Sequence, residues 1–265
     1  MIRSPLMTVM VDAVLKAAKG LRRDFGEIEN LQVSRKGPGD FVSIADHKSE
    51  KILHEALLKA RPDFGFVMEE SGIIEGKDTA NRWHIDPLDG TLNFLHGVPH
   101  FSISVALERD GAYFAGVVYD PIKDELFIAE KGKGAFLNNR RLRVSARKDL
   151  ADCLVGTGIS PSARARFPQF MAEMTTMMDK TASIRRLGSA ALDLAYVASG
   201  RLDGFWETGL NSWDVAAGVV LVREAGGFVT DLQGQEYRVD SASLVAANTN
   251  IHKSLAQTVA AVGAR

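Results

Sequence analysis

Residues 83–91 read Trp-His-Ile-Asp-Pro-Leu-Asp-Gly-Thr, and this short stretch decides the interpretation of the whole chain. An apolar strand ends abruptly here in Asp86 and Asp89, which lie three residues apart around a proline. Pro87 fixes its own φ, and Gly90 permits a tight approach of the backbone. The stretch therefore predicts a strand that ends in a sharp turn with two carboxylates.

Such a turn can direct both carboxylates and the Leu88 carbonyl to one side. The amides of Gly90 and Thr91 would then face outward at the start of a helix. This arrangement suits a hard divalent cation and a phosphate group together. The alternative is an ordinary turn, because Asp-Pro and Asp-Gly are common turn dipeptides.

Composition narrows the class of protein. The 265 residues carry 32 Lys+Arg and 33 Asp+Glu, a formal net charge of −1, and 46% are hydrophobic. This is a globular composition with enough residues for a large core, and it excludes a global electrostatic attraction to nucleic acid or to anionic membranes. The single cysteine, Cys153, cannot form an internal disulfide, and we read no signal peptide or membrane anchor. We therefore expect a soluble, cytoplasmic protein without a membrane partner.

The apolar pattern indicates mixed helices and strands. The first half favours a meander of antiparallel strands after two helices, whereas the second half alternates helices and strands. We expect helices over residues 5–24, 44–60, 163–179, 189–199 and 213–225 and one at the carboxyl end. We expect strands over residues 65–68, 82–85, 101–107, 115–119, 125–129, 183–186 and 203–206.

Further acidic residues lie at the ends of predicted elements. Glu69 and Glu70 follow the strand that ends at Met68, and Asp214 stands at the start of a helix. Each has a structural alternative: a solvated strand end, or an acidic residue at the positive end of a helix dipole. Together with Asp86 and Asp89 they indicate an all-oxygen metal site, which suits Mg²⁺ or Mn²⁺ and disfavours zinc.

Three motifs carry a family resemblance: residues 68–72 (MEESG), residues 85–94 (IDPLDGTLNF), and residues 213–227, which begin WDVAAG and end EAGG. In this order and spacing they resemble the inositol monophosphatase family, and the resemblance runs from about residue 36 to 248. It implies an α+β fold, the layered αβαβα sandwich of the inositol monophosphatase and fructose-1,6-bisphosphatase type. It also implies one phosphatase domain over 1–265 with two closely packed halves, a metal-binding α+β half over about 1–145 and an α/β half over about 146–265.

The resemblance also implies which residues hold metal. Glu69, Asp86 and the Leu88 carbonyl would hold the ion that activates water, with Glu69 also counted as catalytic. Asp86, Asp89 and Asp214 would hold a second ion near the leaving oxygen. We expect two or three Mg²⁺ ions per subunit, with Mn²⁺ as the alternative ion.

Other positions match the family's substrate site. Thr91 would orient the attacking water, Asp46 would hydrogen-bond Thr91 and accept a proton, and Gly90 and Thr91 would bind phosphate through their amides. Lys36 matches a loop lysine near the metals. The sugar side would be formed by Gly188, Ser189, Ala190 and Glu207, with Asp89 and Asp214. Structural alternatives exist for three of these residues: a solvated helix turn for Asp46, a surface lysine for Lys36 and a helix N-cap for Ser189.

The resulting prediction is an enzyme, a Mg²⁺-dependent and lithium-sensitive phosphatase that releases phosphate from inositol monophosphate or a related polyol phosphate, and a homodimer. Alternative substrates are histidinol phosphate, 3′-phosphoadenosine 5′-phosphate and fructose 1,6-bisphosphate. The resemblance also implies a different class of function, because bacterial members of this family act as partners of the transcription machinery. Arg140-Arg141 and Arg185-Arg186 are candidate contacts, and a surface or dimer-interface role is the alternative for both pairs. We interpret His84, His96 and His100 as structural or surface residues and Cys153 as a small buried hydrophobe.

Overall fold

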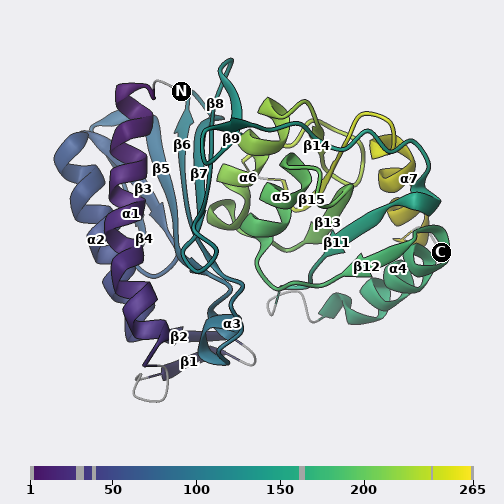
Figure 1. The fold of residues 1–265 in the computed structure, drawn as a ribbon, viewed down its shortest axis with the longest axis horizontal. Helices are drawn as coiled ribbons and strands as arrows, with labels where there is room; N and C mark the ends of the chain where they lie inside the picture. Colours follow the sequence, from purple (N-terminus) through teal and green to yellow (C-terminus); the bar gives the residue numbers. More distant parts are fainter. Residues whose placement is uncertain (1–2, 28–32, 38–39, 161–164, 240, 264–265) are drawn as a thin grey trace.

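The computed structural model describes residues 3–27, 33–37, 40–160, 165–239 and 241–263. Figure 1 shows a layered molecule: an outer pair of helices, a large sheet, a central pair of helices, a smaller sheet and a second outer pair of helices. In that order the helices are α1 (Pro5–Phe25) and α2 (Ile44–Ala60), α5 (Ala190–Ala198) and α6 (Ser212–Glu224), and α4 (Phe167–Lys180) and α7 (His252–Gly263). The predicted αβαβα layering is confirmed.

The large sheet has eight strands among the described residues. Its order is β10 (Arg140–Arg141), β9 (Gly134–Leu137), β8 (Glu125–Glu130), β7 (Ala112–Asp120), β6 (Ser102–Arg109), β5 (Asp78–Asp89), β3 (Phe64–Met68) and β4 (Gly72–Ile74). From β5 to β10 neighbouring strands are antiparallel, which confirms the predicted meander. The meander prediction is wrong for β3, which runs parallel to β5, because the chain between them first pairs β4 on the other edge of β3.

Turn chemistry explains two of the hairpins. Asp110 and Gly111, between β6 and β7, both have positive φ, and so do Asn138 and Asn139 between β9 and β10. Two successive residues with positive φ make a turn whose twist matches that of paired strands. Asn, Asp and Gly tolerate this conformation best, so these short turns fix the register of the strands that they join.

The first outer layer is formed by α1 and α2. Pro5 occupies the first turn of α1, and the Ser4 hydroxyl accepts a hydrogen bond from the amide of Met7. Apolar residues of α1 at helical spacing are fully buried against the large sheet, where they meet Trp83 and Ile85. Burial of each large apolar side chain contributes about 1.5–3 kcal/mol.

The central helices are packed on both sides. The face of the large sheet opposite α1 contacts α6, and the backbone of β7 at Gly116 lies so close that a Cβ there would be 2.6 Å from the carbonyl oxygen of Ala217. Gly218 likewise leaves room for Leu194 of α5. The small residues of α6 therefore bring helix and sheet into close contact, which fixes the place of the helix start.

The smaller sheet has the order β12 (Ser183–Arg185), β11 (Leu154–Thr157), β13 (Gly204–Thr208), β15 (Ser243–Ala247) and β14 (Phe228–Thr230). Its outer face is covered by α4 and α7 around Trp206, and Cys153 is fully buried there, as predicted. The helix expected over 163–179 begins at Phe167, and residues 161–164 lie outside the described part of the chain. The division into halves near residue 145 stays a prediction.

Three short elements gather at one end of the molecule. The hairpin of β1 (Val33–Gly37) and β2 (Asp40–Ser43) lies beside the short helix α3 (Thr91–Leu95), at the bottom of Figure 1. The predicted turn after Asp86 is at this end. Among the described helices, none combines the length and the apolar character that crossing a membrane requires.

Candidate active site

The turn after Asp86 interrupts the pairing of β5 with β6. Asp86 lies opposite Ser104 and Asp89 opposite Ser102, so β5 has one more residue than β6 between these two pairs. Pro87 stands in this bulge, and the amide of Leu88 donates to Asp86 Oδ1 at 3.0 Å. Bulges bend a strand and re-aim its side chains. Two acidic side chains of one strand are thereby placed at its end.

Gly90 connects this turn to the predicted sugar-side segment. Its φ is 94°, and a Cβ there would stand 3.2 Å from the carbonyl oxygen of His100 and 3.3 Å from that of Gly188. A side chain at this position would be both strained and crowded. The Asn93 amide donates to the carbonyl oxygens of His100 and Leu187, each at 2.8 Å, and holds the same segments together.

Thr91 contacts Asp46 from the first turn of α2. Thr91 Oγ1 donates to Asp46 Oδ1 at 3.0 Å and lies 3.0 Å from the Leu88 carbonyl oxygen. The other Asp46 oxygen accepts from the amide and hydroxyl of Ser43, the N-cap of α2, at 2.8 and 2.6 Å. Asp46 is fully buried rather than solvated. Burial raises the pKa of its carboxyl, and the hydrogen bonds from Ser43 and Thr91 oppose that shift.

Glu69 meets Asp86 across the parallel pair β3 and β5. The amide of Glu69 donates to the Ile85 carbonyl at 3.2 Å, and a hydrogen bond joins the side chains of Glu69 and Asp86. The pKa of Asp86 is well above its usual range. Burial is the largest cause, followed by the charges of three carboxylates, Glu69, Asp89 and Asp214. The four predicted acidic ligands are therefore electrostatic neighbours.

Asp89 contacts the start of α5. Its Oδ2 accepts from the Ser189 hydroxyl and from the amide of Ala191 at 2.9 Å. Burial raises the pKa of Asp89, and these hydrogen bonds oppose the shift. Ser189 is also the N-cap of α5, which confirms its structural interpretation, while its place on the sugar side stays a prediction.

Asp214 lies in the first turn of α6, where its Oδ2 accepts from the amide of Asn211 at 2.7 Å. Burial raises the pKa of Asp214, and the negative charge of Asp89 raises it further. A helix start on one side of the site and a strand end on the other thus contribute acidic groups to the same region.

Glu207 lies in β13 with Gly158 beside it, since a Cβ at Gly158 would collide with the Glu207 carboxylate. Asp193 of α5 is a further buried acid that sequence reasoning missed. Burial and the nearby Asp89 charge raise the pKa of Asp193. Burial also raises the pKa of Glu207, and the charges of three carboxylates add to that shift, those of Asp214, Asp193 and Asp89. The signal for Asp193 was an acidic residue in an otherwise apolar predicted helix.

Lys36 lies in β1, and its side chain is outside the part of the chain that the structure describes.

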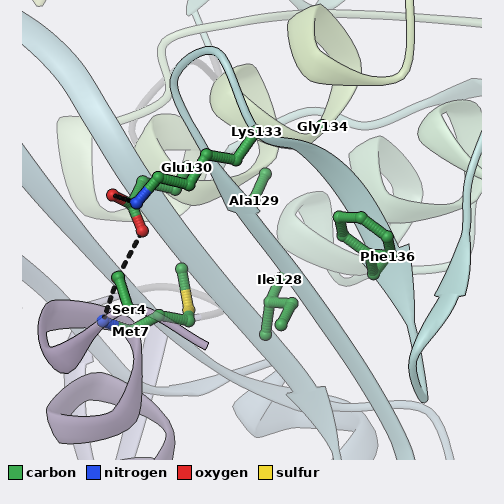
Figure 2. A pocket seen from close by; sticks show the side chains of 8 residues that line it. All are labelled: Ser4, Met7, Ile128, Ala129, Glu130, Lys133, Gly134 and Phe136. Carbon is green, nitrogen blue, oxygen red and sulfur yellow. Dashed lines mark hydrogen bonds and ion pairs between the residues drawn. The ribbon is translucent and has the colours of Figure 1, made fainter. Parts of the chain in front are cut away.

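Two pockets lie away from the predicted site residues. One, of about 310 Å³, is lined by Met7, Ile128 and Phe136 under a polar rim in which Ser4 and Lys133 both contact Glu130 (Figure 2). The other, of about 400 Å³, lies between the β6–β7 turn and residues 235–239. No predicted site residue lines either pocket.

Comparison with known proteins identifies the family. The sequence matches the inositol monophosphatase family over residues 2–264. The chain belongs to this family. A member from Rhizobium meliloti, named inositol-1-monophosphatase, is 56% identical over 259 residues, which are 98% of this chain and 97% of the relative. The predicted resemblance is confirmed and extends beyond residues 36–248.

Two further relatives of this chain carry other names. One is extragenic suppressor protein suhB from Bartonella henselae, whose crystal structure superimposes on this chain with a TM-score of 0.93. The two sequences are 53% identical, and the match covers 97% of this chain and 98% of that one. The Nus factor SuhB of Pasteurella multocida is 43% identical over 252 residues, 95% of this chain and 94% of the relative.

The inositol monophosphatase family is metal-dependent, so its members need residues that accept a cation. Within the described ranges, no three His, Cys, Asp or Glu side chains are arranged as a finished metal site. Asp89 and Asp214 direct oxygens to Ser189 and Asn211 in the conformation described. The chemistry of the donor set nevertheless fits Mg²⁺ or Mn²⁺, because all side-chain donors are carboxylate oxygens whose mutual repulsion a divalent cation would relieve.

Proposed function

We propose that the protein hydrolyses inositol monophosphate to inositol and phosphate with Mg²⁺. The observation that carries the proposal is the acidic group of Glu69, Asp86, Asp89 and Asp214, in which Asp86 is buried and the other three charges help to raise its pKa. A phosphate monoester would be repelled by this group unless cations neutralised it. The family membership and the inositol-1-monophosphatase relatives support the substrate class.

The proposed metal ligands are Glu69, Asp86, the Leu88 carbonyl, Asp89 and Asp214. They would hold two or three Mg²⁺ ions per subunit, and Mn²⁺ would be the substitute. Bound divalent cations lower the pKa of a water molecule and stabilise the oxygens of the displacement. As in the family resemblance, we expect inhibition by Li⁺ and by excess Mg²⁺.

The protein's own groups would orient the water. Thr91 Oγ1 donates to Asp46, so a lone pair of this hydroxyl remains to accept a hydrogen bond from the attacking water. The water proton would pass through Thr91 to Asp46, whose raised pKa suits a proton acceptor. Lys36 is proposed to lie near the phosphate, beside the amides of Gly90 and Thr91.

The sugar would lie against the start of α5. Gly188, Ser189, Ala190 and Glu207 are the proposed hydroxyl contacts, together with Asp89 and Asp214. The close approach of Gly90 to Gly188 supports this placement, since it puts the phosphate and sugar segments next to each other.

The test is a panel of four phosphate monoesters ranked by kcat/KM: inositol 1-phosphate, histidinol phosphate, 3′-phosphoadenosine 5′-phosphate and fructose 1,6-bisphosphate. We expect inositol 1-phosphate to rank first. A higher kcat/KM for any of the other three would replace the proposed substrate and keep the reaction class.

A second proposed function is a binding role in transcription, supported by relatives named Nus factor SuhB. Both arginine pairs are exposed at the edge of a sheet. Arg140-Arg141 forms the edge strand β10, and Arg185-Arg186 lies at the end of the edge strand β12. The test compares growth of a deletion strain with growth of an Asp89→Asn strain. Normal growth of only the Asp89→Asn strain would make binding the primary role, and equal defects would exclude it.

We also infer a homodimer. Helix α4 exposes Phe167, Met171 and Met178 at helical spacing, with Met178 66% exposed. A second copy of the chain would cover this apolar face. Light scattering should give twice the mass of one chain for the wild type and a lower mass for Met171→Glu with Met178→Glu. A wild-type monomer at micromolar concentration would exclude the dimer.

The proposed location is the cytoplasm, because the lone, buried Cys153 forms no disulfide among the described residues. Cell fractionation tests this, and recovery of the protein outside the cytoplasmic fraction would contradict it.

A further inference from the structure

His84 is buried between the large sheet and α6. It lies on β5 with 1% of its surface exposed, on the opposite face of the strand from Trp83 and Ile85. Its ring meets the Tyr113 ring edge to face, with centroids 5.4 Å apart. The predicted structural role explains its burial, but not the polar partners that both ring nitrogens have.

Both nitrogens of His84 are hydrogen-bonded. Nε2 lies 2.8 Å from Glu108 Oε2, and Nδ1 lies 2.9 Å from Ser212 Oγ. A carboxylate can only accept, so Nε2–H donates to Glu108. In the neutral ring Nδ1 is then an acceptor, and it receives the hydroxyl proton of Ser212.

Ser212 is the first residue of α6, two residues before Asp214. The same helix start has a second contact with the large sheet, because the Ser104 hydroxyl lies 3.3 Å from the carbonyl oxygen of Trp213. Ser104 stands opposite Asp86 in the pairing of β5 with β6. Two hydrogen bonds therefore join the helix that carries Asp214 to the large sheet, one to β5, which carries Asp86 and Asp89, and one to the neighbouring β6.

We propose that His84 is a positioning residue: the chain Glu108–His84–Ser212 holds the start of α6 so that Asp214 keeps its place relative to Asp86 and Asp89. The proposal rests on the proposed function in so far as these three carboxylates bind metal. Glu108 acts by holding the imidazole in the orientation that accepts from Ser212. Loss of a hydrogen bond made directly to a metal ligand typically changes metal affinity by about 10–100-fold, and we expect this less direct support to lie at the lower end of that range.

Substitutions can separate this role from simple core packing. His84→Phe keeps an aromatic ring and removes both hydrogen bonds. His84→Asn keeps an acceptor near the Nδ1 position and can still receive the Ser212 proton, whereas His84→Gln reaches only toward Glu108. Ser212→Ala removes the same hydrogen bond from the other side. The matched control is Thr230→Val, which removes a 3.2 Å contact between Thr230 Oγ1 on β14 and His252 Nε2 on α7.

Two measurements on the full chain decide the question. The first is Mn²⁺ binding by calorimetry without substrate, with Asp214→Asn as the reference for a lost ligand. We expect His84→Phe and Ser212→Ala each to weaken Mn²⁺ binding by about tenfold. The double variant should bind Mn²⁺ no more weakly than either single variant, and His84→Asn should retain most of the affinity. Thr230→Val should bind Mn²⁺ like the wild type.

The second is hydrogen exchange of residues 212–216 in metal-free protein. Exchange there should be faster in His84→Phe and Ser212→Ala than in the wild type, and close to wild type in His84→Asn. Unchanged exchange, or full additivity of His84→Phe and Ser212→Ala in Mn²⁺ binding, would overturn the proposal. If Asp214→Asn binds Mn²⁺ as the wild type does, the proposed metal site fails, while the exchange measurement still judges the positioning role.

Discussion

Thr91 Oγ1 donates a hydrogen bond to Asp46 Oδ1 across 3.0 Å, which joins the turn after β5 to the first turn of α2. These residues are 45 positions apart in the chain. The pair is buried on the Asp46 side and borders the acidic group, so a water bound there would have both an orienting hydroxyl and a proton acceptor.

Replacement of Asp46 by Asn tests that pair. Asp46→Asn keeps the size of the side chain and removes the proton acceptor, so we expect kcat for inositol 1-phosphate to fall by about 10²–10⁴-fold with little change in KM. The control is Asp24→Asn, another buried Asp, which pairs with Arg23 in α1 and should leave kcat unchanged. Equal kcat values for the two variants would remove Asp46 from the proposed mechanism.

Gly90→Ala should damage both folding and activity. Its positive φ costs about 1–2 kcal/mol for a residue with a side chain, and the Cβ would press on the carbonyl oxygens of His100 and Gly188. Gly111→Ala is the control, because it has positive φ but no atom near its Cβ. Urea unfolding should show a greater loss of stability for Gly90→Ala, and only this variant should lose kcat/KM. Similar losses in both variants would mean that backbone strain alone matters.

His100 gives a prediction about pH. Burial is the main cause and the Lys123 charge a smaller one, and together they lower the pKa of His100 to about 4. In the unfolded chain His has a pKa of about 6.5, so between these values the unfolded state binds more protons and stability falls as pH falls. The stability advantage of the wild type over His100→Phe should therefore shrink from pH 6.5 to pH 4. An NMR titration of His100 near pH 6.5 would contradict the assignment.

Gly116→Ala tests the contact between β7 and α6. The added methyl group would lie 2.6 Å from the Ala217 carbonyl oxygen, and overpacking of this kind costs about 1–3 kcal/mol. Gly20→Ala is the matched control, because Gly20 lies in α1 with nothing within 4 Å of its Cβ, and Ala there should stabilise by about 0.5–1 kcal/mol. Thermal unfolding of both variants should therefore shift in opposite directions.

Much of the fold could be predicted from local patterns. The helices α1 and α2 begin at Ser4-Pro5 and near Ser43, where capping residues precede apolar periodicity. The β6–β7 hairpin follows from Asp110-Gly111, a dipeptide typical of tight turns between paired strands, and both residues have positive φ. The parallel pairing of β3 with β5 could not be predicted in this way, because it depends on where the chain goes after Met68 rather than on any residue in either strand.

Part of the candidate site could likewise be predicted from the sequence, and part of it could not. Acidic residues at strand and helix ends were visible in the sequence, because Asp86 and Asp89 interrupt an apolar run. The partners of His84 were not visible, since Glu108 and Ser212 come from 24 and 128 residues away. The alternation of side chains along a strand places His84 on the opposite face of β5 from Ile85, but hydrogen bonds between distant segments need the folded chain.

Metal-dependent hydrolysis at the acidic group is best tested by measuring phosphate release from inositol 1-phosphate by the wild type and by Asp89→Asn, first in EDTA and then as Mg²⁺ is added. We expect no turnover in EDTA, recovery with Mg²⁺ for the wild type, and for Asp89→Asn a kcat/KM at least about 10²-fold lower at every Mg²⁺ concentration. Turnover in EDTA, or full Mg²⁺-dependent activity of Asp89→Asn, would contradict metal-dependent hydrolysis at this group.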